Sequence, residues 1–128
     1  MAKNLIGRFY FKLTDNKNLI GEFSNSGDER IYAESADRII PDACHGNFVG
    51  EYNQTWCHYY ENGKVEGNVG TLTIAETSKN KNIFSIKLVV QNRMPLAERT
   101  YWGEGMLCDG MLIGDYRNFK DFNPLPAA

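Results

Sequence analysis

Hydrophobic and polar positions alternate with a period of two along most of this chain. The stretch LIGRFYFKL, residues 5–13, shows the pattern clearly, because Phe9 and Phe11 alternate with Arg8 and Tyr10. This alternation predicts a β-strand with one face buried and the other exposed to solvent. No stretch of the chain carries the longer period of an amphipathic helix.

The same alternation recurs between short polar segments that favour turns. Asn62-Gly63 and Asp109-Gly110 are of the type that forms tight β-hairpin turns. The predicted strands cover residues 5–13, 19–25, 30–35, 47–60, 65–76, 83–90, 100–108 and 111–119. The segment 36–45, which contains Pro41, predicts either a short helical turn or a longer loop.

The fifth predicted strand shows a change of phase. Val65 and Val69 occupy odd positions, whereas Leu72 and Ile74 occupy even ones. A β-bulge among the glycines of residues 67–70 would absorb such a slip, so we predict one there.

Short turns between consecutive strands indicate an antiparallel meander. Eight strands in one sheet tend to close on themselves, because closure removes the exposed edges. We therefore predict an all-β fold, an eight-stranded antiparallel up-and-down β-barrel formed by one domain over residues 1–128. A sandwich of two sheets is the alternative.

Composition and charge narrow the classes of partner. The chain is 42% hydrophobic, and its formal net charge is −2 with scattered basic residues, so no positive surface for nucleic acid is expected. No apolar run is long enough to cross a membrane, and the N-terminus lacks the features of a secretory signal. Three cysteines without a spacing pattern favour reduced thiols and a cytoplasmic location.

The strand at residues 47–60 carries the first candidate site. Tyr52, Gln54 and Trp56 share its even-numbered face. Together with Tyr101 and Tyr116, they would form an aromatic wall with hydrogen-bonding tips inside a barrel. The sequence thus predicts a binding site for a small hydrophobic ligand, with no cofactor. The alternative is that these side chains fill the barrel completely.

Two other functions stay open at this stage. An enzyme such as an isomerase or cyclase would need Glu104, Asp115 or His58 inside the barrel, although the sequence favours a binding protein over an enzyme. A structural protein would place Trp102 and Met106 at an interface between subunits.

The pairs Cys44-His45 and Cys57-His58 invite a metal site. Neighbouring residues on a strand point to opposite faces, so Cys57 and His58 do not ligate one ion together. We therefore expect no metal site.

The segments GNFVGEYNQTW, GTLTIAE, IFSIKLVV and YWGEGMLCDGMLIGDY resemble the succession of strands in avidin, streptavidin and the wider calycin barrels. The chain is also similar to small bacterial proteins with a streptavidin-like barrel. The resemblance spans residues 19–118 and implies the barrel fold and a homo-oligomer, either a dimer or a tetramer. It does not imply biotin binding, because Phe23 stands where avidins carry a tryptophan and the biotin-binding residues do not map onto this chain.

Overall fold

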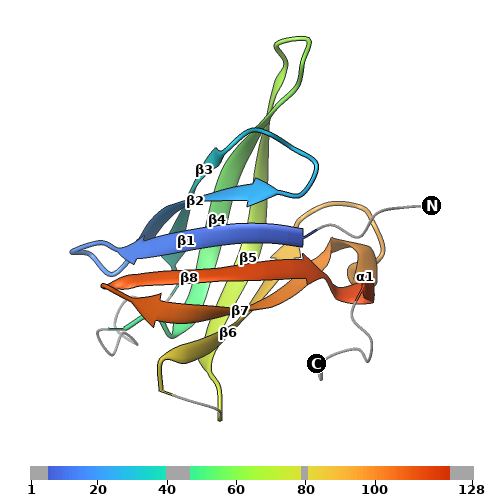
Figure 1. The fold of residues 1–128 in the computed structure, drawn as a ribbon. Helices are drawn as coiled ribbons and strands as arrows, with labels where there is room; N and C mark the ends of the chain where they lie inside the picture. Colours follow the sequence, from blue (N-terminus) through green and yellow to red (C-terminus); the bar gives the residue numbers. More distant parts are fainter. Residues whose placement is uncertain (1–5, 40–46, 79–80, 122–128) are drawn as a thin grey trace.

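The computed structural model describes residues 6–39, 47–78 and 81–121. It confirms the predicted fold class, because eight strands pair in chain order into a closed antiparallel barrel and β1 also pairs with β8 (Figure 1). The strands are β1 (Ile6–Leu13), β2 (Leu19–Asn25), β3 (Tyr32–Arg38), β4 (Gly50–Tyr59), β5 (Val65–Glu76), β6 (Ile83–Val90), β7 (Thr100–Cys108) and β8 (Met111–Asn118). The sandwich alternative is therefore wrong.

The strand ends differ from the prediction mainly around β3. This strand begins and ends later than expected, so residues 36–38 are extended and do not form a helical turn. The rest of the predicted connection, residues 40–46, lies outside the described residues. β4 begins at Gly50, which has a φ of +153°.

The predicted β-bulge in β5 is wrong. The pairing of β4 with β5 runs without interruption from Gly50 opposite Ile74 to Tyr59 opposite Val65. Pairing of β5 with β6 begins only at Gly70, so the start of β5 and the end of β4 form a ribbon that projects beyond the barrel (Figure 1). Val65 and Val69 are exposed on this projecting ribbon, which explains why their phase misled the prediction.

The meander gives the barrel two different ends. The connections after β1, β3, β5 and β7 lie at one end, which we call the sealed end. The connections after β2, β4 and β6 lie at the other end, which we call the hollow end. The tight turn Asp109-Gly110 closes the last hairpin at the sealed end with φ values of +50° and +77°, as expected for a hairpin of this type.

Arg38 occupies the interior of the sealed end. Its side chain is buried, and its guanidinium lies 4.8 Å from the centre of the Tyr52 ring. Below it the interior is packed with fully buried side chains. These are Phe11, Leu19, Tyr52, Leu72, Ile74 and Leu112.

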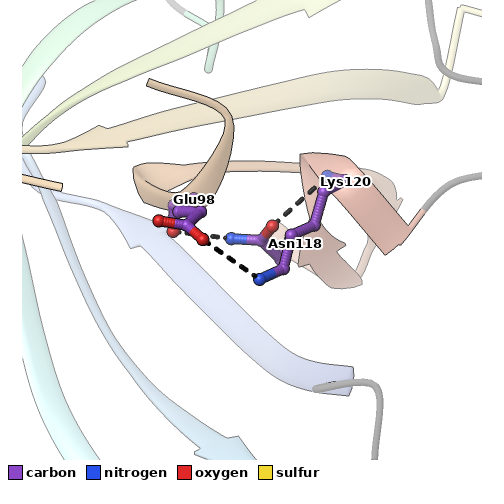
Figure 2. Close-up of polar contacts among 3 residues, drawn as sticks. All are labelled: Glu98, Asn118 and Lys120. Atoms are coloured by element: carbon purple, nitrogen blue, oxygen red, sulfur yellow. Dashed lines mark hydrogen bonds and ion pairs between the residues drawn. The ribbon is translucent and has the colours of Figure 1, made fainter. Parts of the chain in front are cut away.

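The hollow end is partly covered by a short helix, α1 (Leu96–Arg99), in the connection between β6 and β7. The buried side chain of Asn118 donates from Nδ2 to the Glu98 carbonyl oxygen at 2.8 Å, as Figure 2 shows. Lys120, in the 3-10 helix η2 (Phe119–Asp121), also lies 3.8 Å from Glu98 through its Nζ. These contacts fix α1 to the last strand.

Candidate functional site

A cavity of about 260 Å³ lies inside the barrel at the hollow end. Its volume is close to the lower limit usual for small-molecule sites. All eight strands contribute to its wall, and the exposed Asn92, in the connection after β6, marks where it meets solvent.

Aromatic rings make up much of the cavity wall. The six rings that line it are those of Phe9, Phe11, Phe23, Trp56, Tyr101 and Tyr116. Phe23 and Trp56 meet edge to face with centroids 6.4 Å apart, and Tyr101 and Tyr116 do the same at 5.9 Å. Such edge-to-face pairs are favourable and hold rings in defined orientations.

Tyr116 owes its position to a glycine on the neighbouring strand. A Cβ on Gly7 would fall 1.9 Å from Cζ of the Tyr116 ring, so the ring lies directly over that glycine. The Tyr116 hydroxyl donates to Oδ1 of Asn25 at 2.5 Å. The hydroxyl end of the ring is therefore held in place at the junction of the first and last strands.

A carboxyl and an amide form the polar centre of the cavity. Glu34 on β3 and Gln54 on β4 are 7% and 4% exposed, respectively. Nε2 of Gln54 donates to Oε2 of Glu34 at 2.5 Å. The other two oxygens, Oε1 of Glu34 and Oε1 of Gln54, are buried and have no hydrogen-bond partner among the described residues. Orphaned buried oxygens of this kind are rare in folded proteins.

Burial controls the charge of Glu34. It raises the pKa of Glu34 to about 8, because the charged form loses its hydration, and the hydrogen bond from Gln54 opposes this rise only in part. Burial also raises the pKa of the Tyr116 hydroxyl well above its ordinary value. Both groups are therefore mostly protonated at neutral pH in the empty barrel.

The structure separates the predicted site residues into two groups. Gln54, Trp56, Tyr101 and Tyr116 line the cavity. Tyr52 also points inward, but it lies in the core at the sealed end and not in the cavity wall. Its hydroxyl donates to the Phe48 carbonyl oxygen at 2.6 Å, so its polar tip already has a partner.

The residues considered for an enzyme lie elsewhere. Glu104 and Asp115 are exposed on the outer face of β7 and β8. His58 is half-buried and stacks on Tyr32 with centroids 5.4 Å apart. None of the three lines the cavity.

Trp102 and Met106 likewise face away from the lumen. Met106 is 53% exposed, and Trp102 packs against Phe119 and lies under the ammonium of Lys87. The interface predicted for this face stays a prediction.

Cys57 is exposed, whereas Cys44 and His45 lie outside the described residues. Within residues 6–39, 47–78 and 81–121, no three His, Cys, Asp or Glu side chains gather where they could hold a metal ion.

Sequence reasoning missed Glu34, the most informative residue of the cavity. The sequence signal for its burial was its position midway between Tyr32 and Ala36, each two residues away and therefore on the same face of the strand. Both are buried, at 2% and 0% exposure. An acidic residue between two buried positions of one strand face indicates a side chain that points into the barrel.

None of the helices in the described part of the chain has the length and apolar character needed to span a membrane. The chain matches no model of a known protein family, no curated protein and no solved structure. The structure by itself shows a closed, eight-stranded antiparallel barrel.

Proposed function

We propose that this chain is a binding protein that holds a small apolar or aromatic molecule in the cavity at its hollow end. The observation that carries the proposal is the pair of orphaned buried oxygens on Glu34 and Gln54, two residues in the wall of an aromatic cavity. Apolar walls with a few inward polar groups are typical of small-molecule sites.

A purely structural, filled barrel explains these oxygens less well. Leaving a buried polar atom unpaired costs about 1–3 kcal/mol. A protein selected only for stability would place apolar side chains at both positions. A ligand that bonds to the two oxygens would recover that cost, and the surrounding rings would supply the apolar contact.

We also propose that the barrel is of the calycin type. The resemblance of its strand succession to the avidins and the position of the cavity at one end of the barrel support this. The homo-oligomer and the cytoplasmic location stay predictions.

Tryptophan fluorescence offers a direct test. The chain has two tryptophans, of which Trp56 lines the cavity and Trp102 does not. In a Trp102→Phe variant, Trp56 is the sole reporter, and we expect its emission to shift when indole or a related small aromatic compound is added. The matched Trp56→Phe variant retains only Trp102 and should show no shift.

Filling the cavity provides a second test. Leu88 lines the cavity and is only half-buried, so Leu88→Phe should extend a ring into the empty space. We expect this change to abolish the fluorescence response while the melting temperature is unchanged or higher. If no aromatic compound shifts the emission of Trp56 or the melting temperature, the proposed function is wrong.

A further inference from the structure

We infer that the ligand is a small primary amine, with its ammonium group on Oε1 of Glu34 and Oε1 of Gln54 and its apolar or aromatic body among the rings of the cavity. This inference rests on the proposed function and names the chemical class of its ligand.

The hydrogen-bonding character of the orphaned atoms favours an ammonium group. The Gln54 amide nitrogen already donates to Oε2 of Glu34, so the atoms left over are two oxygens on neighbouring strands. An ionised carboxylate and an amide oxygen only accept hydrogen bonds. A primary ammonium carries three donors and can serve both. Bonds between charged partners are also the strong ones.

The charge balance of the cavity also favours a cationic ligand. Glu34 is the only acidic residue of the wall, and no Lys, Arg or His side chain lines the cavity among the described residues. A buried carboxylate without a cation is strongly unfavourable, so the empty site keeps it neutral. A cationic ligand would supply the missing charge, whereas a ligand carboxylate would bring a second acidic group into a wall without a cation.

The aromatic wall favours a cation as well. The faces of Trp, Tyr and Phe rings attract cations, most strongly where water is excluded. Phe23, Trp56 and Tyr116 all belong to the same cavity as Glu34. The wall therefore favours a cation near the carboxyl and an apolar body further along the lumen.

Binding an amine also has a defined proton balance. Below about pH 8 the empty site holds a protonated Glu34 and the free ligand is an ammonium ion, so forming the ion pair releases one proton to solvent. The other titratable groups that line the cavity are the hydroxyls of Tyr101 and Tyr116. The pKa of Tyr116 is raised further, so this hydroxyl does not contribute a charge.

The probe is 2-phenylethylamine, compared with 2-phenylethanol, which has nearly the same shape but no positive charge. Titrations monitor Trp56 in the Trp102→Phe protein. We expect the amine to bind about ten-fold or more tightly than the alcohol. Amine affinity should rise about ten-fold per pH unit from about pH 6 to about pH 8, because one proton is released per ligand.

Two matched variants locate the effect. Glu34→Gln keeps the size of the side chain but replaces one accepting carboxylate oxygen with a donating NH2 group and removes the charge, and should weaken amine binding about ten-fold or more. Glu51→Gln removes an exposed carboxylate from the outer side of β4 and should leave the affinity unchanged. The pH dependence requires no variant and decides the question even if Glu34→Gln does not fold.

The inference is overturned if the alcohol binds as tightly as the amine, or if amine affinity does not change with pH. In the first case the ligand is a neutral molecule that can accept a hydrogen bond from protonated Glu34. In the second case no proton is released when the amine binds, so the proposed ion pair with a carboxyl that is neutral in the free protein is wrong. In both cases the proposed binding function survives. If neither probe nor indole binds, the proposed function itself fails.

Discussion

Arg38 and Glu34 lie on the same inward face of β3, yet their surroundings are opposite. The guanidinium of Arg38 donates to three carbonyl oxygens, those of Lys17, Val49 and Asn47, at 2.9, 2.7 and 2.9 Å. Glu34 has one hydrogen bond, and its second oxygen has no partner within the described residues. In one buried ionisable side chain each guanidinium nitrogen thus has a protein partner, whereas in the other an oxygen has none among the described residues.

This difference separates two uses of a buried polar residue. At the sealed end, the Arg38 side chain bonds to the turn after β1 and to the segment that precedes β4, so its hydrogen-bonding groups are used within the protein. At the hollow end, the polar side chain lies in the wall of a cavity, and one of its oxygens has no partner among the described residues.

The largest effect is expected at Glu34 and depends on pH. Its pKa is about 8 in the folded protein and near the ordinary 4.5 in the unfolded chain. Between these values the unfolded state binds fewer protons, so the stability of the folded state falls as the pH rises from about 4.5 to about 8. The total loss is on the order of 5 kcal/mol.

Glu34→Gln should remove this dependence. Urea unfolding of the wild-type protein and the variant should give similar free energies of unfolding near pH 4.5, and a more stable variant near pH 9. Parallel curves for the two proteins across this range would show that Glu34 is not held neutral by burial.

Arg38→Met tests the sealed end. The change removes the donors to three carbonyl oxygens while keeping most of the apolar volume, and we expect a loss of about 4 kcal/mol. Arg8 is exposed on the outside of β1, so Arg8→Met should change the free energy of unfolding by about 0.5 kcal/mol or less. Equal effects of the two changes would mean that Arg38 does not seal the barrel.

Gly50→Ala should disturb the same end by a smaller amount. A Cβ at this position would lie 2.6 Å from Nη1 of Arg38, and the φ of +153° is one that residues with side chains rarely adopt. We expect a loss of about 2 kcal/mol, measured by urea unfolding. In the Arg38→Met background part of this cost should disappear, because the clash is with the guanidinium.

The smallest effects compare two tyrosine hydroxyls. Tyr52→Phe removes a buried hydrogen bond to Phe48 and should cost about 1 kcal/mol. Tyr116→Phe removes the bond to Asn25 beside the cavity, where water can replace the lost partner, and should cost about 0.5 kcal/mol. The reverse order would contradict the distinction between a packed end and a hollow end.

Much of the fold is predictable from local patterns. Alternation in β1, β6 and β8 marks strands with one buried face, and the hairpin turn Asp109-Gly110 fixes the pairing of β7 with β8. The short connections require consecutive strands to lie side by side in a meander, and a sheet of eight strands favours closure into a barrel. The hydrophobic phase of β5 led to a wrong prediction of a bulge. The first residues of β5 lie on a ribbon outside the barrel, where an apolar side chain need not point into the lumen.

The candidate site was only partly predictable for a different reason. Trp56, Tyr101 and Tyr116 are aromatic, so the alternation pattern points to them. Glu34 and Arg38 break the pattern of β3, because acidic and basic residues are normally exposed. The position of Glu34 between Tyr32 and Ala36 indicates an inward side chain, but the partners that permit burial come from other strands and loops. These are Gln54 for Glu34 and the carbonyl groups around Arg38, and no local pattern identifies them.

The seam between β1 and β8 has a consequence for how the protein folds. Every other strand pair joins neighbours in the chain, whereas this one joins its first and last strands. Tyr116 reaches its place over Gly7 only when that seam forms. A bound ligand that contacts Tyr116 would therefore stabilise the pairing of β1 with β8 and slow the separation of these two strands. Hydrogen exchange would show this as slower exchange of the backbone amides along β1 and β8.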